Sequence, residues 1–155
     1  MAEIYSLVYK PKDENAADHY TRLPLESARL VVGHGIEGDL SGKGNPKRQL
    51  NLMAYETLAQ LATEGFKTEP GEMGEQITLR GLDINALESG TRVQLGDQAV
   101  IEVIKPRTGC ERFEAIQGHL RSDAAGRLGV MARVVVDGVV HVSDPVKVLE
   151  AVSAK

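Results

Sequence analysis

The chain has a single cysteine, no long apolar segment and no strong excess of charge of either sign. Cys110 is the only cysteine among 155 residues, which excludes an internal disulfide. No stretch approaches the roughly 18 consecutive apolar residues of a membrane-spanning helix. The N-terminal sequence MAEIYSLVYK also lacks the basic region and the apolar run of a secretory signal. We therefore expect a cytoplasmic protein that does not enter a membrane.

The overall charge is mildly acidic, with a formal net charge of −4 and 26% charged residues. This balance gives no electrostatic reason to expect nucleic acid or an anionic membrane as a partner. With 42% hydrophobic residues, a chain of this length can bury one core without disulfides or metals. We expect a single domain over residues 1–155.

Short β-branched segments, each bounded by Gly, Pro or Asp, recur along the chain and favour strands over helices. Seven such segments predict a mainly β domain. A closed or nearly closed β-barrel would suit them, because closure removes exposed sheet edges. The expected strands cover residues 28–32, 76–79, 91–95, 99–104, 130–136, 139–142 and 146–150.

Two turn sequences predict hairpins between these strands. Gly96-Asp97 separates the third expected strand from the fourth, and Asp137-Gly138 separates the fifth from the sixth. Asp-Gly tolerates positive φ at both central positions of a tight turn. We therefore expect each of these two strand pairs to be antiparallel neighbours.

Helical periodicity is clear in one segment and weaker in another. Over residues 54–64 the apolar residues recur at helical spacing, and Gly65 follows where a C-terminal cap is expected. A second, short helix is predicted after Cys110, because Phe113 and Ile116 are three residues apart, and Gly118 should end it.

Gly33–Gly38 reads GHGIEG and matches the G-x-G-x-x-G pattern of dinucleotide-binding folds. The residues that follow, DLSGKGNPKRQ, contain two glycines and a proline and cannot form the helix that this fingerprint requires. Lys43, Lys47 and Arg48 lie in or at the end of this glycine loop, and together with its amides they would suit an anion such as phosphate. An ordinary solvated turn is the alternative.

Cys110 is surrounded by basic residues, since Lys105, Arg107 and Arg112 lie within five positions of it. Nearby cations lower the pKa of a thiol and make it a better nucleophile and metal ligand. The pattern leaves three interpretations open: a buried inert thiol, a thiolate activated by a histidine base, or a ligand. The histidines themselves show no zinc-ligand spacing; they are His19, His34, His119 and His141.

Several motifs, taken in order, resemble the MOSC domain family, which is named after the C-terminal part of molybdenum cofactor sulfurase. The segments that carry the resemblance lie within about residues 28–150. They are HGIEGDLSGKGNPKRQLNLMAYETL, PGEMGEQITLRGLDINALESGTRVQLGDQAVIEVIKPRTGC and GVMARVVVDGVV. Where the family often has Asn after Gly-Glu, this chain has Gln76. The resemblance implies a barrel of the MOSC type, related to the pyruvate-kinase barrel, with a few peripheral helices.

The same resemblance implies a role in molybdenum or sulfur chemistry, with the molybdenum cofactor in its molybdopterin form as the ligand. Cys110 takes the position of the family's functional cysteine, proposed to ligate molybdenum or to carry sulfur. At the level of the whole family it also implies pyridoxal phosphate binding. The remaining cofactor-binding positions implied by the family motifs are Gly35, Gly38, Asp39, Arg48, Gln49, Gly74, Glu75, Arg107 and Thr108.

The leading hypothesis is a small reductase of N-hydroxylated compounds that has Cys110 as molybdenum ligand and uses an electron-donor protein. One alternative is a carrier that holds a persulfide received from a sulfur-donor protein, or that delivers the cofactor to a partner. A degenerate module with a structural role is a further alternative. We also expect Gly33–Arg48 to lie beside Cys110. Arg48 and Arg107 are expected to bind the cofactor phosphate, or else to pair with Asp39 or Glu75.

Overall fold

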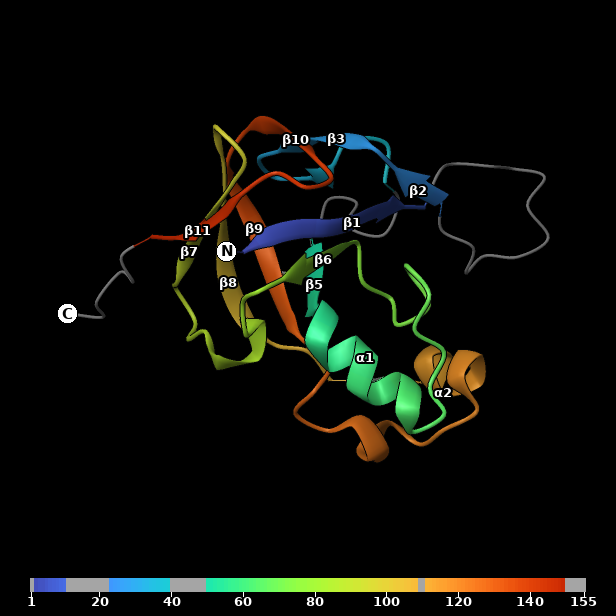
Figure 1. Cartoon of the computed structure of the whole chain (residues 1–155). Helices are drawn as coiled ribbons and strands as arrows, with labels where there is room; N and C mark the ends of the chain where they lie inside the picture. The colour runs from blue at the N-terminus through green and yellow to red at the C-terminus, as the bar shows by residue number, and fades with distance from the viewer. Residues whose placement is uncertain (1, 11–22, 40–49, 109–110, 150–155) are drawn as a thin grey trace.

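The structure is a computed structural model that describes residues 2–10, 23–39, 50–108 and 111–149. Within these residues the chain forms strands β1–β11, helices α1 and α2, and two short 3-10 helices, η1 and η2 (Figure 1). The strands are β1 (Glu3–Tyr9), β2 (Leu23–Leu25), β3 (Ser27–Val31), β4 (Gly35–Ile36), β5 (Leu50–Ala54), β6 (Ile77–Arg80), β7 (Arg92–Leu95), β8 (Ala99–Pro106), β9 (Val130–Val136), β10 (Gly138–His141) and β11 (Val146–Val148). The helices are α1 (Tyr55–Thr63), α2 (Glu111–Gln117), η1 (Ile84–Ala86) and η2 (Arg121–Ala124).

Eight strands form one strongly curled sheet in the order β11-β7-β8-β9-β5-β6-β1-β2, and β10-β3-β4 form a second sheet of three strands. The mainly β class is therefore confirmed. The expected barrel does not fully close, because the first and last strands of the chain meet only at one end. There Glu3 lies opposite Pro145 in a single bridge, and the Ile4 N–H donates to the Asp144 carbonyl at 2.9 Å.

The predicted hairpin at Asp137-Gly138 is wrong, because this turn carries the chain from one sheet to the other. β10 pairs with β3, whereas β9 pairs with β8 and β5 and has no edge left for β10. Asp137 Oδ1 accepts the N–H of Val32 at 2.7 Å and so joins the turn to the end of β3. The turn sequence indicated a reversal correctly but did not indicate the partner strand. The other predicted hairpin, between β7 and β8, is confirmed.

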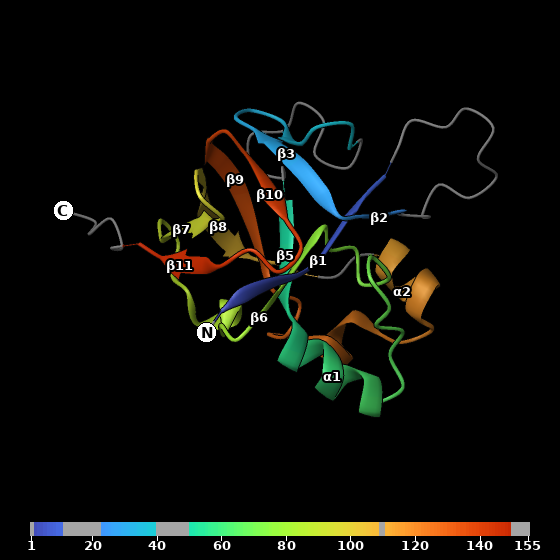
Figure 2. The ribbon, with the colours of Figure 1, turned by 45° about the horizontal axis from the view of Figure 1, so that its top comes forward.

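The core has two parts. The larger part fills the curl of the sheet, and Leu30 and Val140 of the small sheet close over it. The smaller part lies beneath the helices and consists of Met53, Leu58, Leu61, Phe66, Met73, Phe113, Ala124 and Leu128. In Figures 1 and 2, α1 lies at the opposite end of the curled sheet from β3 and β10.

Among the described residues, neither α1 nor α2 has the length and apolar character that a membrane crossing requires.

Candidate functional site

The C-terminal end of β8 is held by Arg107, the residue that follows the strand. The backbone N–H of Arg107 donates to the Gly129 carbonyl at 2.9 Å. Its half-buried guanidinium donates from Nη2 to the Met73 carbonyl at 2.9 Å and from Nη1 to the Leu128 carbonyl at 3.2 Å. Arg107 therefore joins three segments of the chain at a point three residues before Cys110. Cys110 itself lies outside the described residues.

Gly74 lies directly against this guanidinium. Its φ is +84°, and a Cβ built on it would be 2.9 Å from Arg107 Nη2. A side chain at position 74 would therefore be strained and would have to displace the arginine. The structure thus brings together two residues that the family motifs placed 33 positions apart in the sequence.

Glu75 is fully buried, and its carboxylate points inward, where donors surround it. It accepts the N–H groups of Gly71 at 3.0 Å and Met73 at 3.1 Å, and the hydroxyl of Thr78 lies 3.4 Å away. Burial raises the pKa of Glu75, while the backbone N–H donors and the charge of Arg107 act in the opposite direction. The carboxylate fixes the 71–75 turn and does not face solvent.

The raised pKa of Glu75 gives an expected pH dependence for Glu75→Gln. A carboxyl whose pKa is raised on folding binds its proton more tightly in the folded state, so its contribution to stability is lost as pH rises from about 4.5 through the folded pKa. A neutral glutamine has no such titration. Urea unfolding at pH 5 and pH 8 should therefore show the variant gaining stability relative to the wild type as pH rises. A shift in the other direction would mean that the surrounding N–H donors outweigh burial.

Asp39 is the described end of the glycine loop, and a chain of hydrogen bonds connects it to Gly74. Asp39 is 1% exposed and accepts the N–H of Lys10 at 2.8 Å and the side-chain amide of Gln76 at 3.2 Å. Gln76 Oε1 accepts the N–H of Asn51 at 2.7 Å, and Asn51 Nδ2 donates to the Gly74 carbonyl at 3.1 Å. Gln76, which stands where the family often has Asn, thus links the motif that contains Asp39 to the motif that contains Gly74.

The other expected site residues occupy different surroundings. Gly35 is buried in β4 and pairs with Val31, and a Cβ on Gly38 would be 3.7 Å from the Tyr9 ring. Thr108 is exposed beyond the end of β8. Arg48, Gln49 and Cys110 lie outside the described residues, so the expectation that Gly33–Arg48 lies beside Cys110 stays a prediction.

Three polar residues of this region were not predicted from the sequence. Asn51 and Gln76 form the chain described above, and Gln117 at the end of α2 is buried against the 67–73 loop. Asn51 interrupts the apolar run LNLMA, and Gln117 lies four residues after buried Phe113 and hence on the same helix face. A polar residue inside an apolar strand and a polar residue on a buried helix face are the signals that could have identified Asn51 and Gln117 from the sequence.

Among the described residues, no group of three or more His, Cys, Asp or Glu side chains could hold a metal ion.

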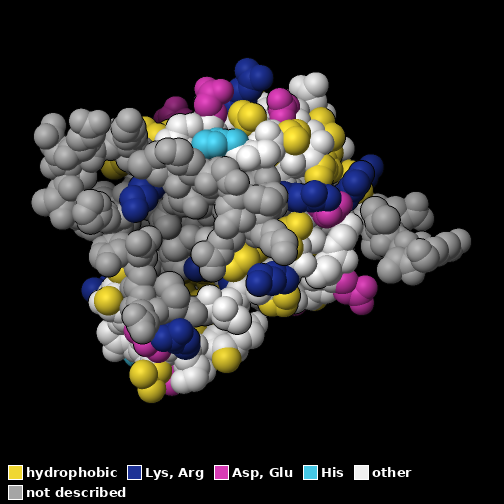
Figure 3. Space-filling model, turned by 180° about the vertical axis from the view of Figure 1, so that it is seen from behind, with side chains coloured by type: hydrophobic (Ala, Val, Ile, Leu, Met, Phe, Trp, Pro, Cys, Tyr) yellow, Lys and Arg dark blue, Asp and Glu magenta, His cyan; other side chains and the backbone are white. Residues whose placement is uncertain are grey.

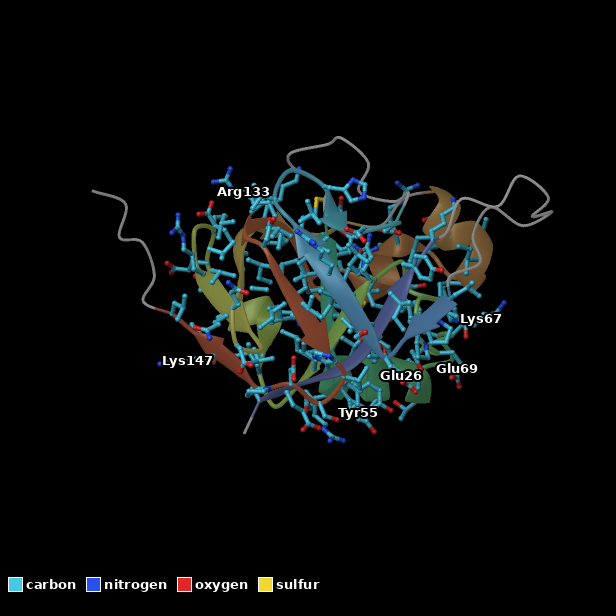
Figure 4. The ribbon with its side chains drawn as sticks, turned by 90° about the horizontal axis from the view of Figure 1, so that it is seen from above. Glu26, Tyr55, Lys67, Glu69, Arg133 and Lys147 are labelled. Carbon is cyan, nitrogen blue, oxygen red and sulfur yellow. The ribbon has the colours of Figure 1, made fainter. Side chains whose placement is uncertain are left out.

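The face of the molecule seen from behind is mixed in character (Figure 3). Lys and Arg side chains are scattered among apolar ones on this face. The 67–76 loop also borders a hollow of about 200 Å³ on the side of β1 and α1. Tyr55 and Glu69, which line this hollow, are labelled in Figure 4. The ring of Tyr55 stacks on that of Tyr5 with centroids 4.4 Å apart.

Comparison with solved structures shows the same fold in several bacterial proteins. The YuaD protein of Bacillus subtilis is 18% identical with a TM-score of 0.78, and the alignment covers 96% of both chains. YiiM of Geobacillus stearothermophilus is 20% identical with a TM-score of 0.75, over 99% of this chain and 78% of that one. YiiM of Escherichia coli is 22% identical with a TM-score of 0.70, over 97% and 71%. Comparison with curated protein sequences gives no match.

The sequence model of the MOSC domain matches residues 39–147, a range that contains Asp39, Gly74, Glu75, Arg107 and the position of Cys110. This range covers more than half of the chain, including Gly74, Arg107 and Gly129 at the end of β8. MOSC domains are associated with the molybdenum cofactor. The chain belongs to the MOSC domain family.

Proposed function

We propose that the protein binds the molybdenum cofactor in its molybdopterin form and reduces N-hydroxylated compounds, with Cys110 as the molybdenum ligand. The observation that carries the proposal is the anchoring of Arg107 by the carbonyls of Met73 and Leu128. This anchoring fixes one end of the segment that contains the only thiol of the chain. A thiolate is the protein ligand best matched to a soft metal centre.

The charges of the described residues fit an anionic cofactor at this end of β8. The two acidic residues among the implied cofactor-binding positions, Asp39 and Glu75, are buried, and their oxygens accept hydrogen bonds from within the protein. The side chains of Lys105 and Thr108 are exposed near the strand end. Neither of these two carboxylates therefore faces an incoming phosphate. Arg48, with Arg107, is our candidate for holding that phosphate.

Reduction of an N-hydroxylated compound consumes two electrons and two protons, breaks the N–O bond, and yields the amine and water. The bound cofactor would supply the redox chemistry that no side chain of this protein offers, and an electron-donor protein would restore it. The chain's own contribution is positional. Arg107 fixes the strand end and Cys110 supplies the thiolate, while the 71–75 turn keeps the Glu75 carboxylate buried.

The reductase activity can be tested with protein produced in cells that make the cofactor. With a reduced dye as electron donor, the wild type should convert an aryl hydroxylamine to the amine, and Cys110→Ala should lose the activity. Cyanide treatment of the same samples measures sulfane sulfur. A protein that holds sulfane sulfur on Cys110 but does not turn over the hydroxylamine is a carrier, and the reductase proposal would then be wrong.

A further inference from the structure

The hollow of about 200 Å³ beside α1 has a lining that suits one kind of ligand. It lies between β1, β6, α1 and the 68–70 segment, and its described lining consists of nine residues. Five of them carry a hydroxyl group, three are apolar, and Glu69 is the one with a charge. The space is smaller than the pockets of about 300–1,000 Å³ that hold drug-sized molecules, so it suits a compact ligand.

A bulge in β1 brings two side chains of that strand to the hollow. In the pairing of β1 with β6 the register shifts between Ile4 and Ser6, so Tyr5 is the extra residue. Successive residues of a regular strand point to opposite faces of the sheet. Because of the bulge, Tyr5 and Ser6 both line the hollow.

Tyr5 and Tyr55 form an aromatic wall of the hollow. Their rings stack at 4.4 Å with an angle of 8° between them, and Tyr5 remains 41% exposed. The guanidinium carbon of Arg80 lies 5.6 Å from the centroid of Tyr5 and 5.9 Å from that of Tyr55, so the rings already attract one cation. Arg80 is itself paired with Glu3, which offsets its charge, and it is not among the described lining residues.

Glu69 gives the hollow a negative charge that no neighbour offsets. Its side chain is exposed at the rim. No basic side chain in the part of the chain that the structure describes forms an ion pair with it. An anion in the hollow would meet this carboxylate without a lining cation to hold it, whereas a cation would gain a charge-assisted hydrogen bond.

We propose that this hollow is a binding site for a small organic cation, an amine or amidine with an aryl or short alkyl body. The body packs against the aromatic wall and Leu58, and the protonated nitrogen pairs with Glu69. A neutral molecule of the same shape lacks the charge-assisted bond and binds more weakly. The proposal is independent of the proposed function, because it uses neither Cys110 nor the molybdenum cofactor.

The test compares benzylamine with benzyl alcohol, which has nearly the same shape but no charge. Binding to the full chain at pH 7 is followed through the backbone amide signals of ¹⁵N-labelled protein. Benzylamine should bind with a Kd of about 1 mM or lower and should shift the amides of Ser6, Thr68 and Thr78 most. Benzyl alcohol should bind about five-fold or more weakly.

Glu69→Gln removes the charge and keeps the shape of the side chain. It should weaken benzylamine about five-fold or more and leave the binding of benzyl alcohol unchanged. Glu72→Gln is the matched control, because it makes the same change of charge on the same loop at a residue outside the described lining. This control should bind benzylamine within about two-fold of the wild type.

A second variant tests the location without changing the charge. Ala59→Leu, at an exposed lining position of α1, keeps a good helix former and fills part of the hollow, so it should weaken benzylamine about five-fold or more. Gln60→Leu, on the other side of α1, should bind like the wild type. The proposal is overturned by equal affinities for the two ligands, by unchanged binding in Glu69→Gln or Ala59→Leu, or by amide shifts centred away from the hollow.

Discussion

Gly129→Ala is expected to destabilise the protein by about 3–5 kcal/mol, the largest effect among our predictions. Gly129 has a φ of +77°, and a Cβ built on it would be 1.8 Å from the Leu52 carbonyl oxygen. The obstacle is strand backbone in the middle of the large sheet, so no side-chain rotation can relieve it. Gly129 also accepts the N–H of Arg107 and donates to Asn85 Oδ1, so a shift at this residue reaches the candidate site.

Gly126→Ala is the matched control for this prediction. Its φ of +78° is nearly the same, but a Cβ at this position meets nothing within 4 Å. The control should therefore cost only the conformational penalty of a left-handed residue, about 1–2 kcal/mol. Urea unfolding of both variants measures the difference. Equal losses of stability would show that the contact with Leu52 does not limit position 129.

Arg107→Ala is expected to reduce the free energy of unfolding by about 2–4 kcal/mol. The variant leaves the carbonyls of Met73 and Leu128 without a charged donor. It also removes the cation that opposes the effect of burial on the pKa of Glu75. Arg107→Lys should recover only part of the loss, because one ammonium does not reproduce the planar fork that reaches two carbonyls.

The same variant decides between the two roles considered for Arg107. If the arginine grips the cofactor phosphate, Arg107→Ala should weaken cofactor binding by about ten- to a hundred-fold in the molecules that remain folded. Arg48→Ala should weaken binding similarly if that arginine shares the phosphate. A variant that melts early while its folded fraction binds normally would assign Arg107 to the fold alone. Binding and melting temperature are therefore measured on the same preparations.

The strands found from the sequence are short β-branched segments, and several of them, such as β3, β7 and β8, also alternate buried residues with more exposed ones. β9 was predicted with its observed bounds, and β3 and β8 within two residues at either end. β1 was missed because its buried residues Ile4, Leu7 and Val8 do not alternate, since the register shifts between Ile4 and Ser6. β5 was missed because it leads directly into α1, so no turn sequence marks its end. It is also paired with a neighbouring strand on both edges.

The site was predictable in residue type but not in its contacts. The motifs identified Gly74, Glu75 and Arg107 as special positions, yet the partners of Arg107 are backbone carbonyls, which leave no trace in the sequence. The inward orientation of the Asp39 carboxylate also depends on donors from distant segments, Lys10 and Gln76. Spacing alone therefore could not separate residues that hold the site from residues that face a ligand.

Molybdenum and pterin content, measured in protein purified from cofactor-competent cells, tests the central claim most directly. The wild type should contain molybdenum and pterin in near-equal amounts, and Cys110→Ser should retain little molybdenum, because a neutral hydroxyl is a poor ligand for a soft metal. The melting temperature of the variant, measured alongside, should stay close to that of the wild type. A wild type that contains no molybdenum, or a Cys110→Ser variant that contains as much as the wild type, would contradict the assignment of Cys110 as the metal ligand.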